Sequence, residues 1–223
     1  MPLPGSRQGI LARRLLKWHG NSQLDYPWRR TQDPFAVLLS EVMLRKTTRR
    51  QVRSVFSSFY KRFPNPEALD YASASGIEGE IRMLGMQKVR ARGLKQLGRV
   101  IVRQHRGVVP NQKEQLMSLP LVGQYTANAV LCFAFGKELP LVDTNVARIV
   151  GRIFSHHSKK KRPQTDPKLW KFVGELIPKG KAREFNLAIL DFGDSLCLAS
   201  SPKCSLCPML DICDYGNKFI TFG

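Results

Sequence analysis

The chain has 223 residues, 43% of them hydrophobic, which is enough for one large domain or two small lobes and gives no sign of disorder. Its 36 Lys and Arg residues outnumber its 17 Asp and Glu residues, and the net charge of +19 points to a polyanionic partner, with nucleic acid as the leading candidate. No apolar run approaches the roughly 18 residues that span a bilayer, and the first 21 residues lack a signal-peptide core, so we expect a soluble protein without a membrane partner.

Apolar residues recur at three- and four-residue steps in the first part of the chain, as they do on one face of a helix. This pattern covers residues 10–18, 35–44 and 52–60. Asp33 and Pro34 supply a cap and a first-turn proline for the second of these helices. Inside it, Glu41 is a lone acid among apolar residues, and such an acid is either a surface residue or a deliberately placed one.

Basic residues recur through helical segments and are not confined to a tail. They gather in residues 45–53, 88–99 and 159–162. A single cation of this kind ordinarily belongs to a solvated helix face, so only their sum argues for phosphate binding, with an affinity that falls steeply with salt. Because strand-like alternation is nearly absent, we predict an all-α protein of about nine to eleven helices.

The segment Leu119–Ala127 predicts a tight connection between two helices. One helix ends before Leu119, the turn contains Gly123, and a second helix begins near Gln124. Backbone amides at the start of that second helix can hold a phosphate oxygen, and Gly123 permits a close approach. This is a helix-hairpin-helix arrangement over residues 113–136, although Pro and Gly between two helices commonly do no more than connect them.

An aspartate follows the next loop. Gly136 and Pro140 mark that loop, and Asp143 comes directly before an amphipathic stretch that ends at Phe154. This position suits the N-cap of a helix. Considered alone, Asp143 is explained more readily by a capping role than by chemistry.

Four cysteines near the end of the chain have the spacing Cys-x6-Cys-x2-Cys-x5-Cys. They are Cys197, Cys204, Cys207 and Cys213. Four thiolates suit tetrahedral zinc or an iron–sulfur cluster. The long outer arms favour a [4Fe–4S] cluster over zinc, and a disulfide framework is typical of small secreted chains instead. Cys132 lies in an apolar run and is expected to be a core residue.

The hairpin, the Gly/Pro-rich loop, Asp143 and the cysteine tail together resemble the endonuclease III superfamily of base-excision DNA glycosylases, over nearly the whole chain. The resemblance implies two helical lobes that grip DNA: a six-helix barrel at residues 29–138, and a [4Fe–4S] cluster domain made of residues 1–28 and 139–223. It also implies a target nucleotide flipped out of the duplex. Asp143 would then stabilise the cationic sugar that forms as the base leaves.

Two further positions define the type of glycosylase that the resemblance implies. Tyr125 stands where bifunctional members carry a lysine, and a phenol cannot form a Schiff base, so we expect a monofunctional enzyme. A packing role for this tyrosine is the alternative. Glu41 matches a glutamate that lines the base pocket, where apolar surroundings would raise its pKa and suit it to proton transfer.

The subfamily follows from two short stretches. Residues 44–48, Leu-Arg-Lys-Thr-Thr, and residues 185–192, Phe-Asn-Leu-Ala-Ile-Leu-Asp-Phe, resemble the mismatch-specific thymine/uracil glycosylases of the Mig type more than the MutY-type adenine glycosylases. Leu121 departs from the usual first glycine of the hairpin. We therefore expect removal of thymine or uracil mispaired with guanine. An adenine glycosylase, and a non-catalytic DNA-binding module with a structural metal, remain the alternatives.

The resemblance also assigns binding residues and partners. Expected DNA contacts are Leu119, Val122, Gly123, Gln124, Arg45, Lys46, Thr47, Lys203 and Leu187. Leu187 is a candidate apolar wedge into the base stack, with helix packing as its alternative. Trp28 and Asn145 are expected in the base pocket. The partner is double-stranded DNA with a mismatched or deaminated base, followed by an abasic-site endonuclease. We expect a monomer, cytoplasmic and nucleoid-associated if prokaryotic.

Overall fold

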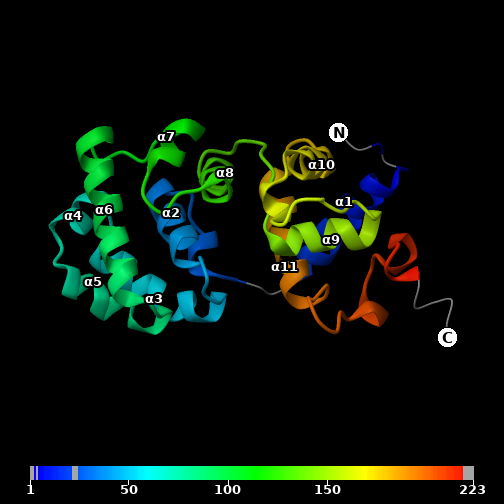
Figure 1. Ribbon diagram of the computed structural model, residues 1–223, viewed down its shortest axis with the longest axis horizontal. Helices are drawn as coiled ribbons and strands as arrows, with labels where there is room; N and C mark the ends of the chain where they lie inside the picture. Colours follow the sequence, from blue (N-terminus) through cyan, green and yellow to red (C-terminus); the bar gives the residue numbers. More distant parts are fainter. Residues whose placement is uncertain (1–2, 4, 22–24, 218–223) are drawn as a thin grey trace. The chain divides into compact units, whose positions relative to one another are not determined.

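The computed structural model describes residues 3, 5–21 and 25–217, and all regular structure in these ranges is helical (Figure 1). The α-helices are α1 (Arg7–Gly20), α2 (Pro34–Met43), α3 (Arg49–Arg62), α4 (Pro66–Tyr71), α5 (Ala74–Glu80), α6 (Gln87–His105), α7 (Lys113–Ser118), α8 (Gln124–Phe133), α9 (Thr144–Phe154), α10 (Pro167–Leu176) and α11 (Ala182–Ser195). Short 3-10 helices are η1 (Pro27–Arg29), η2 (Arg82–Leu84), η3 (Pro163–Thr165), η4 (Cys204–Leu206) and η5 (Leu210–Ile212). The prediction of an all-α fold is confirmed.

Side-chain caps fix where several of these helices begin. Asp33 accepts hydrogen bonds from the amides of Phe35 and Ala36 at the start of α2, as its sequence position predicts. Thr48 and Gln51 form a reciprocal capping box at the start of α3. The capping residues therefore determine where these helices begin, and the spacing of the apolar residues determines which face of each helix is buried.

The chain forms two compact units. One is the continuous segment Asp25–Lys137, which contains α2 to α8. The other combines Met1–Leu24 with Glu138–Gly223 and contains α1, α9, α10, α11 and the cysteine tail. The assignment of residues 29–138 to a six-helix barrel, and of residues 1–28 and 139–223 to a cluster domain, stays a prediction.

Each unit has its own set of packed helices. In the continuous unit α4 and α5 pack on α6, while α2 packs on α8. Cys132 on α8 is buried, in agreement with its predicted core role. In the discontinuous unit α1 and α9 pack on α11, where the His19 ring contacts the fully buried Asp191 carboxylate at 3.0 Å. Among the described helices, none has both the length and the apolar character that crossing a membrane requires.

The contact between α4 and α6 depends on a glycine. A Cβ atom added at Gly98 would stand 2.7 Å from the Pro66 carbonyl oxygen and 2.7 Å from Leu69 Cβ. The backbone of α4 cannot rotate away as a flexible side chain would. We therefore expect Gly98→Ala to lower the free energy of unfolding by about 1–3 kcal/mol, the usual cost of overpacking, although alanine favours helix formation.

Chemical denaturation measures this effect, and Gly79→Ala in α5 is the matched control. Nothing lies within 4 Å of a Cβ atom built at Gly79, so that variant is expected to be unchanged or slightly more stable. Equal stability of the Gly98→Ala variant and the unsubstituted protein would contradict the packing described for α4 and α6.

Candidate functional site

The predicted hairpin lies between α7, which ends at Ser118, and α8, which begins at Gln124. Gly123 occupies the N-cap position of α8, and no side chain caps that helix. The first amides of α8 are therefore not bound by a capping side chain, in contrast to those of α2. A Cβ atom at Gly123 would meet nothing within 4 Å, so the approach to these amides is open. This is the backbone geometry that a phosphate group requires.

Leu121 adopts a left-handed conformation within this hairpin, with φ of 68°. A leucine in this region is strained, and glycine would not be. Its side chain lies against α6 at Gly93, where a built Cβ atom would come within 2.8 Å of Leu121 Cδ1. Its carbonyl oxygen accepts a hydrogen bond of 2.6 Å from Arg45 Nη1. Packing against α6 and the hydrogen bond from Arg45 thus hold Leu121 in a backbone conformation that is unfavourable for leucine.

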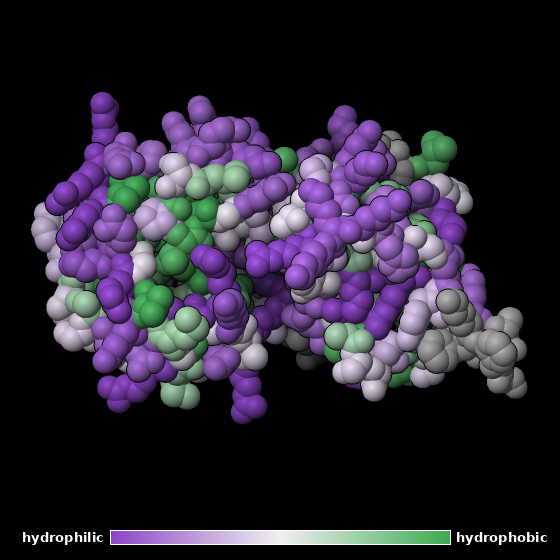
Figure 2. Space-filling view, viewed as in Figure 1, coloured by the Kyte–Doolittle hydropathy of each residue, from purple (hydrophilic) through white to green (hydrophobic). Residues whose placement is uncertain are grey.

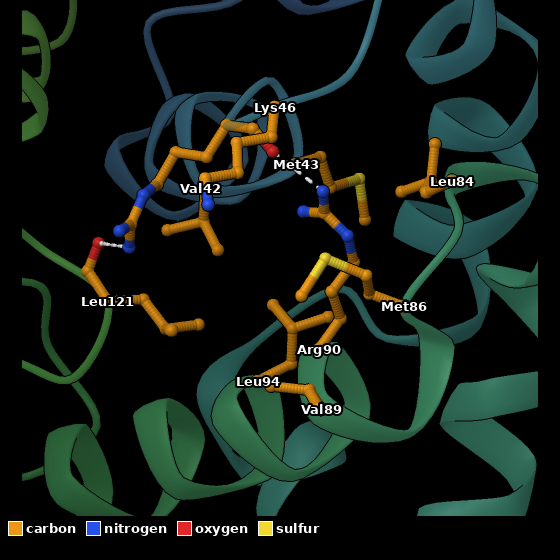
Figure 3. Close-up of a pocket in the computed structure, with 10 residues that line it drawn as sticks. Val42, Met43, Lys46, Leu84, Met86, Val89, Arg90, Leu94 and Leu121 are labelled. Carbon is orange, nitrogen blue, oxygen red and sulfur yellow. Dashed lines mark hydrogen bonds between the residues drawn. The ribbon is translucent and has the colours of Figure 1, made fainter.

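An apolar cavity of about 170 Å³ adjoins the hairpin (Figure 3). Its lining comes from the end of α2 and the loop after it, from the stretch that runs from η2 into α6, and from Leu121. Apolar residues in the lining are Val42, Met43, Leu84, Met86, Val89, Leu94 and Leu121, and the cationic ones are Arg45, Lys46 and Arg90. Figure 2 shows apolar surface among hydrophilic side chains in the region of α2 and α6.

Glu41 and Tyr125 belong to the same compact unit and lie on helices that pack together. Glu41 is in the third turn of α2 and is only 7% exposed, which excludes the alternative of an ordinary surface acid. Tyr125 is the second residue of α8 and is half-buried. Because α2 packs on α8, the acid and the phenol lie on one pair of packed helices.

Asp143 belongs to the discontinuous unit and caps α9, as its position in the sequence predicts. Its Oδ1 atom accepts a hydrogen bond of 2.7 Å from the Val146 amide. Burial raises the pKa of Asp143 above its ordinary value, the hydrogen bond from Val146 opposes this change, and the charge of Asp194 adds to it. Asp143 is therefore a half-buried carboxylate whose hydrogen bond from the Val146 amide orients it at a helix start.

Asn145 has both polar atoms of its amide bound inside its own unit. Its Nδ2 atom donates to Asp194 Oδ1 at 2.9 Å, and its Oδ1 atom accepts from Arg148 Nη1 at 2.8 Å. Arg148 also donates to the Cys197 carbonyl oxygen at 2.7 Å. The role of Asn145 in a base pocket stays a prediction; in the structure it joins α9 to α11, and Arg148 joins α9 to the cysteine tail.

The four cysteine thiols lie near one another and form no disulfide. Burial raises the pKa of Cys207 to about 11, and the charges of Cys213, Cys197 and Cys204 add to this effect. No three His, Cys, Asp or Glu side chains of the described ranges converge on a single metal position.

Hydrogen-bond donors surround the sulfur atoms. Arg152 Nη1 donates to Cys197 Sγ at 3.4 Å, the Met209 amide donates to Cys207 Sγ at 3.4 Å, and the Gly216 amide donates to Cys213 Sγ at 3.3 Å. Four thiols with such donors fit the ligand chemistry of an iron–sulfur cluster, in which hydrogen bonds to sulfur tune the potential. Arg148 and Arg152 in this region were not singled out by the sequence, because a lone arginine on a helix has no distinguishing pattern.

The remaining predicted site residues are placed as follows. Trp28 is 6% exposed and stacks on Tyr26 with ring centroids 5.0 Å apart, so it is part of an aromatic cluster. Thr47 donates from its hydroxyl to the Met43 carbonyl oxygen. Arg45, Lys46 and Lys203 are exposed, while Leu187 is half-buried within α11. Val122 is buried, and Leu119 is 3% exposed. Their DNA contacts stay predictions.

Comparison with protein families decides the identity of this arrangement. Residues 39–175 match the model of the HhH-GPD superfamily base excision DNA repair protein. The chain belongs to the HhH-GPD superfamily. Residues 197–213 also match the iron-sulfur binding domain of endonuclease III. The predicted family is thus confirmed, and the cofactor of this HhH-GPD protein is a [4Fe–4S] cluster.

Individual relatives narrow the comparison within the HhH-GPD superfamily. A thymine/uracil-DNA glycosylase of Pyrobaculum aerophilum is 44% identical over 208 residues, which are 92% of this chain and 90% of the relative. An adenine DNA glycosylase of Mycobacterium tuberculosis is 38% identical over 201 residues, which are 89% of this chain and 65% of the relative. The solved structure of a thermostable thymine-DNA glycosylase has a TM-score of 0.90 and 34% identity, and covers 95% of this chain and 97% of that chain.

Proposed function

We propose that this HhH-GPD protein is a monofunctional DNA glycosylase that hydrolyses the N-glycosidic bond of thymine or uracil mispaired with guanine and leaves an abasic site. The observation that carries this proposal is the similarity to a thymine/uracil-DNA glycosylase over nine-tenths of both chains. The adenine alternative has less support, because the adenine relative shares lower identity and this chain spans 65% of its length.

The proposed reaction uses this chain's residues in distinct roles. The open amides at the start of α8 hold a phosphate of the target strand, together with the hairpin residues around Gly123. The target nucleotide leaves the stack. Asp143 faces C1′ and stabilises the positive charge that develops on the sugar, an interaction that is absent before the bond breaks. Glu41, buried among apolar side chains, moves a proton to the base or from the attacking water.

Cofactor and partners complete the proposal. The ligands of the cluster are Cys197, Cys204, Cys207 and Cys213, and the cluster itself supports DNA binding and takes no part in bond cleavage. Mismatched or deaminated duplex DNA is the substrate, and an abasic-site endonuclease follows. The protein acts as a monomer and associates with the nucleoid.

One assay tests the reaction and the specificity. The purified protein is incubated with duplexes containing T:G, U:G or A:G mispairs and with a fully paired duplex, and each is then treated with alkali. We expect strand breaks at T:G and U:G alone. Breaks at A:G alone would establish the adenine alternative, and the absence of breaks on all four duplexes would leave a DNA-binding module.

Tyr125→Lys tests the monofunctional assignment. A lysine at this position supplies an amine where we place C1′, so we expect a covalent adduct with DNA that borohydride traps, and strand cleavage without alkali. Tyr125→Phe is the control, because it keeps the ring and offers no amine. Absence of an adduct in a folded Tyr125→Lys variant that still binds DNA would place C1′ away from the start of α8.

A further inference from the structure

We infer that Arg90 is a positioning residue that ties three surface loops of the Asp25–Lys137 unit into one rigid surface for the DNA duplex. The three loops are residues 44–48 after α2, residues 85–86 before α6, and the hairpin at 119–123. The inference rests on the proposed function only in taking DNA as the polyanion that this surface meets.

Two of the loops are joined by the Arg90 side chain itself. Its Nη2 atom donates to the Arg45 carbonyl oxygen at 2.6 Å, and its Nε atom donates to the Gly85 carbonyl oxygen at 3.1 Å. Figure 3 shows this guanidinium extending from α6 across the cavity to the end of α2. A planar guanidinium can hold two carbonyl groups at once, whereas a lysine ammonium is a single point of charge on a flexible stem.

The third loop is joined through Arg45. Arg90 holds the backbone of Arg45, and the Arg45 side chain donates to the Leu121 carbonyl oxygen at 2.6 Å. The two arginines therefore act in series from α6 to the hairpin. Within the ranges that the structure describes, both guanidinium groups donate to backbone carbonyl oxygens and neither pairs with a carboxylate, so no acidic side chain neutralises their positive charges.

All three loops contain a non-glycine residue in the left-handed region, and this is why they need to be held. The residues are Lys46 with φ of 56°, Met86 with φ of 50° and Leu121 with φ of 68°. Such residues are uncommon, and they persist only where their surroundings impose the conformation, most often at functional sites. Three of them border a single cavity, and the arginine hydrogen bonds reach the backbone beside each one or at it.

Charge and burial support a specific role for Arg90. Burial and the neighbouring charge of Arg45 lower the pKa of Arg90. This environment disfavours a charged guanidinium unless other contacts stabilise it there. Lys46, which also lines the cavity, is exposed. The resulting rim of three cations around an apolar floor fits the phosphates of a duplex.

Hydrogen exchange of the full-length, cluster-containing protein without DNA tests the inference. In Arg90→Lys, we expect faster exchange at the Thr47, Gly85 and Val122 amides together, by about tenfold, as follows from the loss of one charge-assisted hydrogen bond. Arg92→Lys is the matched control, because Arg92 is exposed and its Nε atom bonds only the Lys88 carbonyl of its own helix. Amides of α4 serve as an internal reference for global stability.

DNA binding gives the second readout. Because Arg90→Lys keeps the charge but releases the three loops, we expect its affinity for fully paired and for mispaired duplex to fall alike, by about tenfold. Unchanged exchange in all three loops, or a change at Gly85 alone, would overturn the inference. A failed glycosylase assay with the unsubstituted protein would overturn the proposed reaction and leave the exchange result standing.

Discussion

Asp143→Asn is expected to lower the rate of base release by at least about a hundredfold, the loss that follows removal of one preorganised group from a charged transition state. Asparagine keeps the shape and the capping oxygen, so the hydrogen bond to the Val146 amide survives. DNA affinity should be retained for the same reason. Single-turnover kinetics on a T:G duplex, with the enzyme in excess, measure the chemical step apart from binding.

Asp166→Asn is the matched control for that experiment. Asp166 caps α10 as Asp143 caps α9, and its side chain accepts from Ser158 and from the Lys168 amide. A rate that falls equally in both variants would attribute the effect to helix capping. A rate near that of the unsubstituted enzyme in Asp143→Asn would remove this residue from the mechanism.

The pH dependence of the rate follows from the same carboxylate. Burial raises the folded-state pKa of Asp143 above the ordinary value, so protonation, and loss of activity, begin at a higher pH than for an exposed aspartate. The raised pKa favours folding below the unfolded-state pKa, and this contribution disappears as the pH rises through the folded-state value. At neutral pH the Asn variant should therefore be at least as stable as the unsubstituted protein.

Cys207→Ala is expected to produce the largest structural change. The tail is attached to the rest of its unit by Arg148 and Arg152 on α9 and by ion pairs such as Arg7 with Asp214, but it has little apolar packing of its own. Loss of the cluster removes the bonds that fold such a segment. A loss of about 4 kcal/mol would lower the Tm by roughly 8–16 °C for a chain of this size.

Iron content, visible absorbance, limited proteolysis and thermal unfolding measure this result. We expect little iron, rapid cleavage within residues 197–217 and weak DNA binding. Cys132→Ala is the control, since Cys132 is a core residue of the other unit and its loss should leave the iron content unchanged. A colourless native protein that contains zinc would contradict the assignment of the cofactor.

Periodicity and capping residues predict most of this fold from the sequence. Long helices with regular apolar spacing, such as α2 and α3, and the hairpin between α7 and α8 follow from local rules. The four cysteines are recognisable by their spacing, whereas Asp143 by itself predicts only a helix cap and gains a chemical role through the resemblance to the glycosylase family. These features depend on neighbours in the chain, and a single sequence records them directly.

The arginine contacts could not be predicted in this way. Arg90 belongs to a basic segment that we counted as phosphate-binding, yet its guanidinium holds two carbonyl groups of the protein. Lys95 in the same segment likewise donates to the carbonyl oxygens of Asp70 and Ala72. A cation looks the same in sequence whether it faces solvent, DNA or a distant carbonyl. Left-handed lysine and methionine residues also lack a signature, because only glycine, asparagine and aspartate indicate that conformation.

The contact between Leu121 and Gly93 allows the cavity beside the hairpin to change shape by substitution. A methyl group at position 93 would push the tip of the leucine, a flexible group, and the neighbouring cavity has space to receive it. Substitutions at position 93 would thus reshape the cavity floor, whose lining does not include Asp143, Glu41 or Tyr125. Evolution could in this way change the affinity of the protein for undamaged DNA without changing the residues proposed to break the glycosidic bond.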